Sequence, residues 1–504
     1  MIRREVKKML SEAEISELIQ SDASSELKSM ARVGERYYEG DHDIRNSKLY
    51  YFDAEGNLVE DRFKSNIRIS HPFFTELVDQ QVQYMLSGEG NLIRSDDPEL
   101  QTYLDDYFDD DFYSEVYELL IGTISKGFEY MYAVTDPEGK TRFECADSIG
   151  VVEVRAKDTD DGCEYFIFWY IDRIDKGHKT IKRIQVWDKE QVYFYVQVQE
   201  GKIELDDSVP ENPRMHTILT DERGKKYGKG FGFIPFWRLD NGRKRFSGVK
   251  PIKALIDDYD LMACGLSNNL EDFSDALYVV SGFQGSNLDE LIQNIKIKKH
   301  IGDDSDGGID VKTIDIPYEA RQTKLDLDEK NIYRFGMGFN SAQLGDGNIT
   351  NVVIKSRYAL LDLKCNKLEI RLKQFFRKLI QVVLDEINQE QDTDYQQKDV
   401  YFHFEREVMT NAADNAAIEK TDAEKQQVQI NTLLGLANVL DDETIIQQIC
   451  DVLDLDYEEI KDQLPKDEEA ETDQAQLDLN SIIPDDTGGM TDEQQSEGSA
   501  AGAA

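Results

Sequence analysis

The chain has 504 residues, of which 101 are acidic and 58 are basic, so its net charge at neutral pH is −43. A surface this acidic repels phosphate backbones, which excludes nucleic-acid binding through extended basic patches. Because 40% of the residues are hydrophobic and 10% are aromatic, the sequence can bury real cores, unlike an acidic disordered protein. The length predicts several domains.

The sequence shows no candidate membrane span and no secretory signal. Its longest apolar run, Tyr165 to Ile171, is far shorter than the roughly 18 residues that a span requires. The first residues, MIRREVKKMLSEAEIS, contain no apolar core. We therefore expect a cytoplasmic protein. The five cysteines are far apart without CxxC spacing, and we expect separate buried thiols at Cys145, Cys163, Cys264, Cys365 and Cys450.

The N-terminal part predicts helices on either side of a hairpin. A helical pattern runs from Val6 to about Glu39, and KLYYFDAEGNLVED after it has apolar residues on both sides of a turn. The stretch SHPFFTELVDQQVQYMLSGEG predicts a helix that is capped by Ser70, has Pro72 in its first turn and ends at Gly88. Its predicted buried side consists of Phe74, Leu77, Val78, Val82 and Met85.

Between residues 133 and 237 the apolar period changes to two. Segments such as CEYFIFWYIDRI and QVYFYVQVQ are rich in aromatic and β-branched residues and are separated by turn sequences, which predicts a meandering sheet. A helix then resumes, with apolar residues every three or four positions. This seam, which another helix or another subunit would cover, consists of Ile252, Leu255, Tyr259, Met262, Leu266, Leu270 and Phe273.

A small insert at residues 275–316 lies between two predicted helices. It contains apparent strands at ALYVVSGF, KKHI and IDVKTIDI and a short helix at LDELIQNI. The chain returns through a polar helix from Pro317 to Phe335, whose apolar anchors are Tyr318, Leu325, Ile332 and Phe335. This pattern predicts a stalk of two helices that carries the insert as a small domain at its tip.

The last third begins with GMGFNSAQLGDGNIT at residues 336–350, where glycines and small polar residues interrupt the helices. The next helix, Asn351 to Asn388, would be about 55 Å long. The strand VYFHFERE, with Val400, Phe402 and Phe404 on one face, is expected to join the earlier sheet. Residues 411–464 predict three short acidic helices, and the acidic segment after Pro465 predicts disorder.

The search for catalytic or metal motifs finds one candidate. The six histidines never pair at metal-ligand spacing, DDSDGG fails the EF-hand pattern, and GDGNIT is not followed by the Lys of a phosphate-binding loop. The acidic segment DDYFDDDFYSE would allow a metal-dependent nuclease that uses Asp105, Asp109, Asp110 or Asp111. Its simpler interpretation is a solvated segment that leads into a helix, so we expect no enzyme, no metal and no cofactor.

The order of these features resembles the portal proteins of tailed bacteriophages, of the siphophage type from phages of Gram-positive bacteria. The resemblance runs from about residue 30 to residue 465. It rests on stretches that occur in the same order: RYYEGDHDI, KSNIRISHPFFTELVDQQVQYMLSG, GFIPFWRLDNG, IKALIDDYDLMACGLSNNLEDFSDALYVVSGF, DGGIDVKTIDIP and FGMGFNSAQLGDGNITNVVIKSRYALLDLKCNKLEIRLKQFF.

The resemblance implies an α+β portal fold with a β-rich wing and long helices. Its regions are then the wing at 1–245, stem helices at 246–272 and 317–336, the clip at 273–316, the tunnel loop at 337–350, the long helix and a wing strand at 351–410, crown helices at 411–464 and an acidic disordered tail at 465–504.

The resemblance also implies a function and a set of partners. Portal proteins form a homo-oligomeric ring, of about twelve copies, at one capsid vertex of the virion, after assembly in the host cytoplasm. The ring conducts double-stranded DNA without sequence specificity during packaging and ejection. Its partners are the terminase large subunit, a head-completion or adaptor protein, and the major capsid and scaffolding proteins. No membrane is involved.

The channel residues follow from the same resemblance. The tunnel loop would contribute Asn340, Ser341, Gln343, Gly345, Asp346, Gly347 and Asn348, which give mobility without an aromatic platform for stacking bases. Weak rings of positive charge would come from Lys324, Lys330 and Arg334 on the stem helix and from Lys355 and Arg357 after the loop. An alternative is that these cations simply lie on solvent-exposed helix faces and have no role in a channel. A third candidate for the whole chain, an acidic scaffolding or DNA-mimic protein, leaves the stalk and the long helix unexplained.

Overall fold

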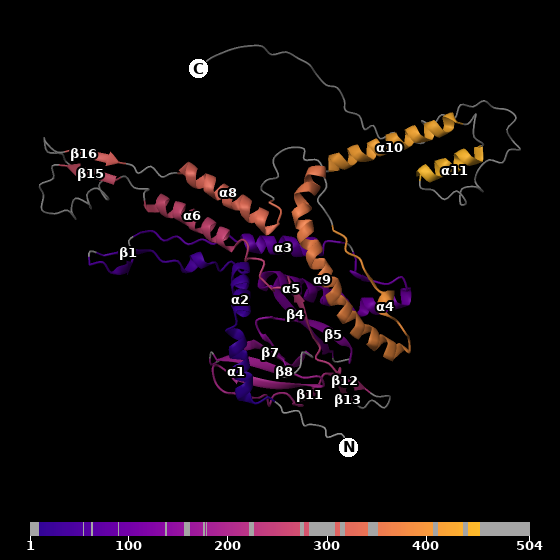
Figure 1. The fold of residues 1–504 in the computed structure, drawn as a ribbon, viewed down its shortest axis with the longest axis horizontal. Coiled ribbons are helices and arrows are strands. Elements are labelled where there is room, and N and C mark those ends of the chain that lie inside the picture. Colours follow the sequence, from indigo (N-terminus) through magenta and orange to yellow (C-terminus); the bar gives the residue numbers. More distant parts are fainter. Residues whose placement is uncertain are drawn as a thin grey trace, which may run out of the picture. The chain divides into compact units, whose positions relative to one another are not determined.

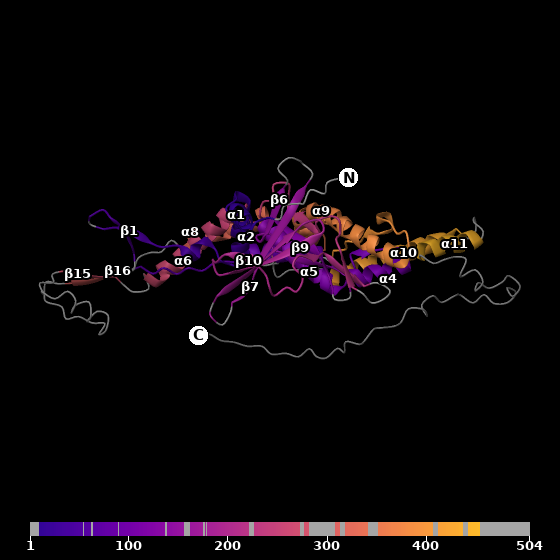
Figure 2. The same cartoon turned by 90° about the horizontal axis from the view of Figure 1, so that it is seen from below.

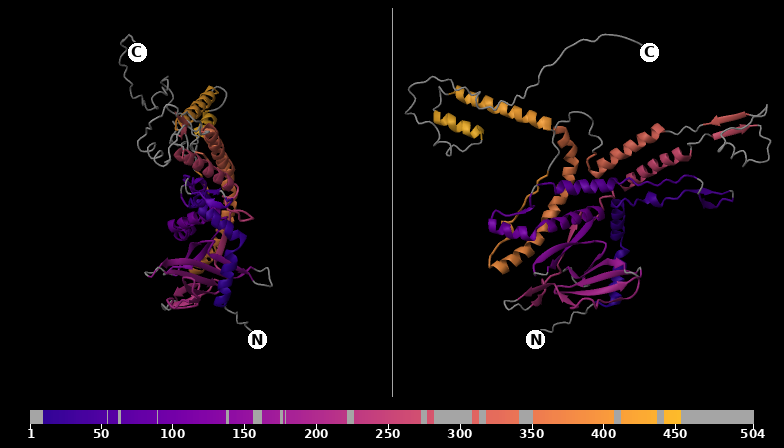
Figure 3. Two further views of the ribbon diagram at one scale, coloured as in Figure 1. Left: turned by 90° about the vertical axis from the view of Figure 1, so that its left-hand side faces the viewer. Right: turned by 180° about the vertical axis from the view of Figure 1, so that it is seen from behind.

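The structure is a computed structural model of the whole chain. It describes residues 10–53, 55–61, 64–88, 90–136, 139–155, 162–174, 177, 179–220, 226–272, 277–281, 308–312, 318–340, 351–406, 412–436 and 442–453. The chain divides into two compact units, Met1–Asn411 and Ala412–Ala504. Figures 1 to 3 show the elements, which mix helices and strands as predicted.

Unit 1 begins with two helices in place of the single predicted one, α1 (Glu12–Ala23) and α2 (Glu26–Tyr38). The break has a local cause, because the Ser25 side chain accepts a hydrogen bond from the backbone N–H of Lys28 and so caps a new helix. Ser11 and Glu14 form a capping box at the start of α1. The cap formed by Ser25 therefore divides a segment whose apolar residues alone would predict one continuous helix.

The predicted meandering sheet is confirmed as a six-stranded antiparallel sheet. Its strands are β6 (Val151–Arg155), β7 (Cys163–Ile174), β8 (Thr180–Trp187), β9 (Gln191–Val198) and β10 (Ile203–Leu205), with β11 (Arg214–Met215) paired to β9. Helix α1 covers one face, where Ile15 and Ile19 pack with Ile167 and Ile184.

A second sheet has the order β14 (Phe236–Asp240), β4 (Phe128–Thr135), β5 (Thr141–Ala146). Because side chains alternate along a strand, β4 faces two cores. Tyr130 and Tyr132 pack with aromatic residues of the six-stranded sheet, whereas Met131 and Ala133 point to the helices. The second sheet therefore joins the six-stranded sheet to the helical layer.

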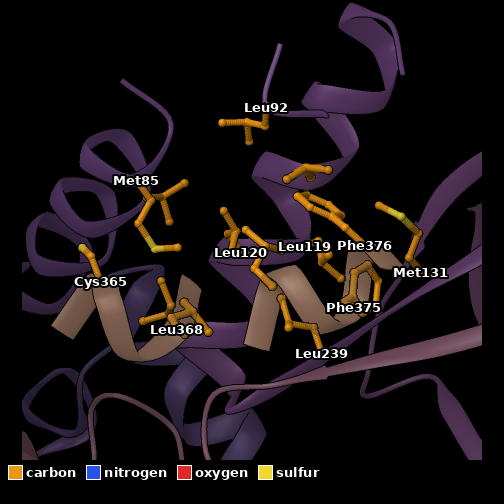
Figure 4. Close-up of a cluster of buried hydrophobic side chains, with 14 of the residues drawn as sticks. Met85, Leu92, Leu119, Leu120, Met131, Leu239, Cys365, Leu368, Phe375 and Phe376 are labelled. Carbon is orange, nitrogen blue, oxygen red and sulfur yellow. The ribbon is translucent and has the colours of Figure 1, made fainter. Parts of the chain in front are cut away.

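The largest core lies among four helices, α3 (Phe73–Met85), α4 (Pro98–Tyr107), α5 (Asp110–Lys126) and α9 (Asn351–Gln391). Figure 4 shows how Met85 of α3, Leu120 of α5 and Phe376 of α9 converge in it. The long helix is confirmed, with 41 residues and thus about 60 Å. Its predicted apolar face, from Leu361 to Ile387, is buried.

Helix α3 starts two residues later than predicted. Its N-cap is Pro72 without a side-chain cap, and the hydroxyl of Ser70 instead donates to the carbonyl of Gly40. The helix ends at Met85, with Leu86 as its C-cap, before the predicted Gly88. The predicted buried residues of α3 are all buried.

Helices α6 (Lys253–Asp272) and α8 (Tyr318–Gly336) lie side by side (Figure 1), and the chain between them in the sequence contains a hairpin of β15 (Leu277–Ser281) and β16 (Gly308–Lys312). The predicted apolar faces of both helices are only partly buried within the single chain. At α6, Ile252 of the predicted seam is buried, as are Ile256, Asp260 and Cys264, whereas Leu270 is exposed, which the prediction of a seam that another subunit would cover allows. In α8, Leu325 and Ile332 are buried as predicted, but Tyr318 and Phe335 are exposed. The expected segments LDELIQNI and KKHI lie outside the described residues, as does DDSDGG except for Gly308, the first residue of β16.

Three short pairings complete unit 1: β1 (Tyr50–Phe52) with β2 (Leu58–Glu60), β12 (Thr217–Thr220) with β13 (Lys226–Lys229), and β17 (Tyr401–Phe402) with β3 (Ile93–Arg94). The first is the predicted hairpin. The last corrects the prediction that VYFHFERE joins the earlier sheet, because its partner is a two-residue strand before α4. Short 3-10 helices occur at η1 (Asp43–Asn46) and η4 (Gln397–Asp399).

Unit 2 contains α10 (Ala412–Gly435) and α11 (Asp442–Leu453), which contact each other. Three short helices were predicted for residues 411–464. The first of them is longer than predicted, because α10 has 24 residues. The third predicted helix and the predicted disordered tail lie outside the described residues.

Candidate functional site

The base of α6 is fixed by a buried carboxylate between two histidines. Asp260 is fully buried, and its oxygens lie 2.6 Å from Nδ1 of His42 and 2.7 Å from Nδ1 of His71. It also accepts the backbone N–H of His71 at 2.9 Å. Burial by itself would raise the pKa of Asp260, but the hydrogen bonds from both histidines outweigh burial and hold that pKa below its usual value. A charged Asp260 therefore ties α6 to the segments before η1 and α3.

A lysine connects α6 to α8. The Nζ atom of Lys324 in α8 forms ion pairs with Asp258 of α6 and with Asp328 one turn further along α8. Hydrogen bonds to these two carboxylates raise the pKa of Lys324. Of the residues predicted to line a channel, Lys324 thus has its charge balanced within the helix pair.

Helix α8 ends in a C-terminal capping motif, after which the chain continues along α3. Met337 has a positive φ of 56°, the N–H of Gly338 donates to the carbonyl of Tyr333, and that of Met337 donates to Arg334. These two bonds form a Schellman motif, which satisfies carbonyls at a helix end. The chain then continues along α3 as a bound segment.

Two glycines allow that close approach. A Cβ atom on Gly336 would lie 2.7 Å from Cδ1 of Leu77, and one on Gly338 would lie 2.0 Å from Cδ2 of Leu77. Leu77 is buried in α3, so it has little room to move. At these two positions glycine allows close packing against α3, and it does not serve to interrupt structure as the sequence suggested.

Phe339 is the anchor of the segment. Its backbone N–H donates to Oε1 of Gln80 at 3.0 Å, and its carbonyl accepts from Nε2 of the same side chain at 2.8 Å. Its ring stacks on Tyr358 of α9, with centroids 4.7 Å apart, and Tyr358 also contacts Tyr84 of α3. The chain is thereby held against α3 both before residue 341 and after residue 351.

The other predicted channel residues are divided by what the structure describes. Asn340 donates to Oε1 of Glu329 at 2.8 Å, which turns its side chain back to α8. The rest of the predicted loop, Ser341, Gln343, Gly345, Asp346, Gly347 and Asn348, lies outside the described residues, as does the side chain of Arg357. Lys330, Arg334 and Lys355 are exposed.

The acidic segment of residues 105–115 has structural uses. Asp109 caps α5 by accepting from the N–H of Phe112 at 3.0 Å, and it pairs with Arg142 at 2.9 Å. Asp105 accepts from Asn91 and Gln101, while Asp110 and Asp111 lie exposed in the first turn of α5, where its dipole favours acids. Within the described residues, no group of three or more His, Cys, Asp or Glu side chains is arranged to hold a metal ion. All five cysteines are free, and Cys264, Cys365 and Cys450 are buried as predicted.

Comparison with known proteins identifies the family. The model for phage portal proteins of the SPP1 Gp6-like type matches residues 21–473. The chain belongs to this portal family. The portal protein of Bacillus phage SPP1 is 28% identical over 346 residues, which cover 68% of this chain and 67% of that protein. The portal protein of Clostridium phage phiCD119 is 26% identical over 407 residues, which cover 75% and 85% of the two chains.

The chain is thus a phage portal protein, as the sequence predicted. In the part that the structure describes, no helix is long and apolar enough to cross a membrane. Sequence reasoning missed Leu77, Gln80 and Tyr358, which hold the ends of the predicted loop of this portal protein. A signal was present, because Gly336 and Gly338 are two residues apart beside an aromatic residue, which is typical of close backbone packing. The pairing of His42 and His71 with Asp260 left no local signal, since 189 residues or more separate the histidines from the aspartate.

Proposed function

We propose that this portal protein forms a ring, of about twelve copies, at one vertex of a phage capsid and conducts double-stranded DNA during packaging and ejection. In this proposal the terminase large subunit docks on the ring during packaging, and a head-completion or adaptor protein replaces it afterwards. The ring contacts the major capsid and scaffolding proteins during assembly in the host cytoplasm. It performs no catalytic step of its own.

The proposed regions follow the family resemblance. Residues 1–245 are the wing, α6 and α8 are the stem, residues 273–316 are the clip where the terminase docks, and residues 411–464 are the crown. Support for the stem comes from the ion pairs of Lys324, which join α6 and α8 into one unit, and from Asp260, which ties α6 to His42 and His71. Such a unit can transmit force between the clip and the wing.

The observation that carries the proposal is the anchoring on both sides of residues 341–350. The backbone of Phe339 is held by Gln80 of α3, and its ring stacks on Tyr358, which also contacts Tyr84 of α3. Residues 341–350 therefore connect two fixed points of one packed core. A segment with two fixed ends can contact DNA while the rest of the subunit stays in place. We propose that the tunnel loop starts at Ser341, four residues later than the sequence suggested.

The charge of the chain supports passage of DNA over its capture. Strong phosphate binding by many cations would hold DNA in place, whereas a net charge of −43 keeps the attraction weak. Lys330, Arg334 and Lys355 are exposed and remain proposed channel cations, together with Arg357.

A deletion tests the loop assignment. Removing Ser341–Asn348 should leave ring assembly intact, because Phe339, Gln80 and Tyr358 remain, and should impair packaging. Rings are counted in particle images, and packaging is measured as DNase-protected DNA in assembled heads. The matched control deletes Thr491–Gly498, eight residues of the predicted tail. Normal packaging by the Ser341–Asn348 deletion would refute the loop assignment.

A further inference from the structure

Helix α9 carries a charge opposite to that of the whole chain. Its residues 351–384 contain eight basic and two acidic side chains, in a protein with 101 acids and 58 bases. The two acids, Asp362 and Glu369, form ion pairs with Arg406, and Glu369 also pairs with Lys373. Several basic side chains of α9 thus remain for a partner that the subunit itself does not supply.

Three of the remaining bases, the exposed Lys367 and Lys378 and the half-buried Arg371, lie on one side of α9. We define the outer stripe as Leu360, Leu363, Lys367, Ile370, Arg371 and Lys378, which follow each other at helical spacing opposite the buried face. Leu360, Leu363 and Ile370 are 41%, 61% and 62% exposed. Within the described residues, Lys367, Arg371 and Lys378 have no ion-pair partner. The stripe therefore combines three apolar side chains with three cations.

A strongly acidic segment forms α4 and the first turns of α5. Residues 96–118 contain ten acidic residues and no lysine or arginine. Asp110, Asp111 and Glu118 are exposed, and they have no ion-pair partner among the described residues. We call the exposed acids of α4 and α5 the acidic face. Its charge complements the outer stripe.

The outer stripe and the acidic face lie on opposite sides of the large core. Helix α9 buries Leu372 and Phe376 in the large core, while α4 and α5 bury Leu104 and Val116 in the same core. Figure 2 and the left panel of Figure 3 show α9 along one side of this core, and α4 with α5 on the other. One subunit therefore cannot bring its own outer stripe and acidic face together.

We propose that the outer stripe of one subunit docks on the acidic face of the next. The contact is heterologous, since it joins two different surfaces, and heterologous contacts form a ring when the rotation between neighbouring subunits closes. The inference rests on the ring proposed above, and it adds which surfaces meet. DNA is a poorer fit for the stripe, because a phosphate backbone offers nothing to Leu360, Leu363 and Ile370, whereas a protein surface covers them.

Charge reversal on each surface tests the proposal. One variant carries Lys367→Glu with Lys378→Glu, and a second carries Asp111→Lys with Glu118→Lys. Each alone places like charges in the contact and should raise the concentration at which half of the protein is in rings by about tenfold or more. Mixing the two variants pairs each reversed surface with an opposite charge, so rings should return near the wild-type concentration. Native mass spectrometry and particle images measure the ring fraction.

Two controls keep the outcomes distinct. Lys189→Glu with Lys202→Glu makes the same charge change on exposed positions of the six-stranded sheet and should leave assembly unchanged. Far-ultraviolet circular dichroism and the urea unfolding midpoint report whether each variant folds. Wild-type rings with normal rings from both reversed variants would overturn the docking proposal alone. Normal rings with a packaging defect in the Lys367→Glu, Lys378→Glu variant would assign the stripe to DNA. A wild-type chain that never self-associates would overturn both the ring and the contact.

Discussion

A single carboxylate shows how a buried charge can organise an acidic chain. Asp260 is fully buried, yet it stays ionised because His42 and His71 supply hydrogen bonds that water would otherwise provide. Around it, Lys253 pairs with Asp43 and Asp257 at 2.6 and 2.7 Å. The base of α6 is thus held by directional contacts, which fix its position more narrowly than apolar packing alone.

Replacing this carboxylate should weaken the fold. We expect Asp260→Asn to lower the free energy of unfolding by about 2 kcal/mol, since the amide loses charge-assisted hydrogen bonds to both histidines. The measurement is urea unfolding at neutral pH. Asp207→Asn, at an exposed position, is the matched control and should change stability by less than about 0.5 kcal/mol.

The same variant predicts a pH dependence. The folded pKa of Asp260 lies below its unfolded value, so its contribution is complete above about pH 4 and is lost as the pH falls through the folded pKa. The difference in unfolding free energy between wild type and Asp260→Asn should therefore shrink as the pH falls below about 4. A difference that stays unchanged or grows as the pH is lowered from 4 would contradict the ionised state of Asp260.

At the scale of elements, the joint between α8 and α3 depends on small residues. Gly338→Ala would place a methyl group against the buried Leu77, so we expect a loss of about 1–3 kcal/mol, as for other overpacked cores. Thermal and urea unfolding measure it. At Gly242 a Cβ meets nothing within 4 Å, so Gly242→Ala should be nearly neutral. Equal stability of the two variants would mean that the joint is looser than described.

Elements with strong internal signals were predictable from the sequence. The 41-residue α9, the buried side of α3 and the antiparallel sheet follow from apolar periods of three to four and of two. The break between α1 and α2 was missed because a serine cap competes with the apolar period. Strand β17 pairs with β3, 307 or more residues earlier in the chain, and no local pattern can encode such a partner.

The candidate site was predictable only in part, because several of its contacts join residues that are far apart in the sequence. Family resemblance located the glycine-rich stretch, and the structure corrects the role of its first residues, which pack on α3. The buried face of α6 was misjudged because it contains Asp260, a polar residue that only its distant histidine partners make suitable for burial. The sequence also did not reveal that Lys324, a predicted channel cation, pairs with Asp258 of α6. These contacts join elements that are far apart in the sequence.

At the scale of the whole molecule, the charge distribution bears on two requirements of the proposed function. An acidic chain would avoid holding DNA, yet the subunits of the proposed ring, which each carry −43, would have to overcome strong mutual repulsion. A basic and apolar outer stripe against an acidic face would provide local attraction within an overall repulsive surface. Assembly should then weaken at high salt, where the attraction between the stripe and the acidic face is screened, while the apolar residues of the stripe retain part of the contact.

The measurement that tests the central claim most directly is the mass of the purified wild-type chain by native mass spectrometry, with particle images of the same sample. We predict a closed ring of about twelve copies around an open channel. A chain that remains a monomer or a dimer as its concentration is raised and scaffolding protein is added would contradict the account.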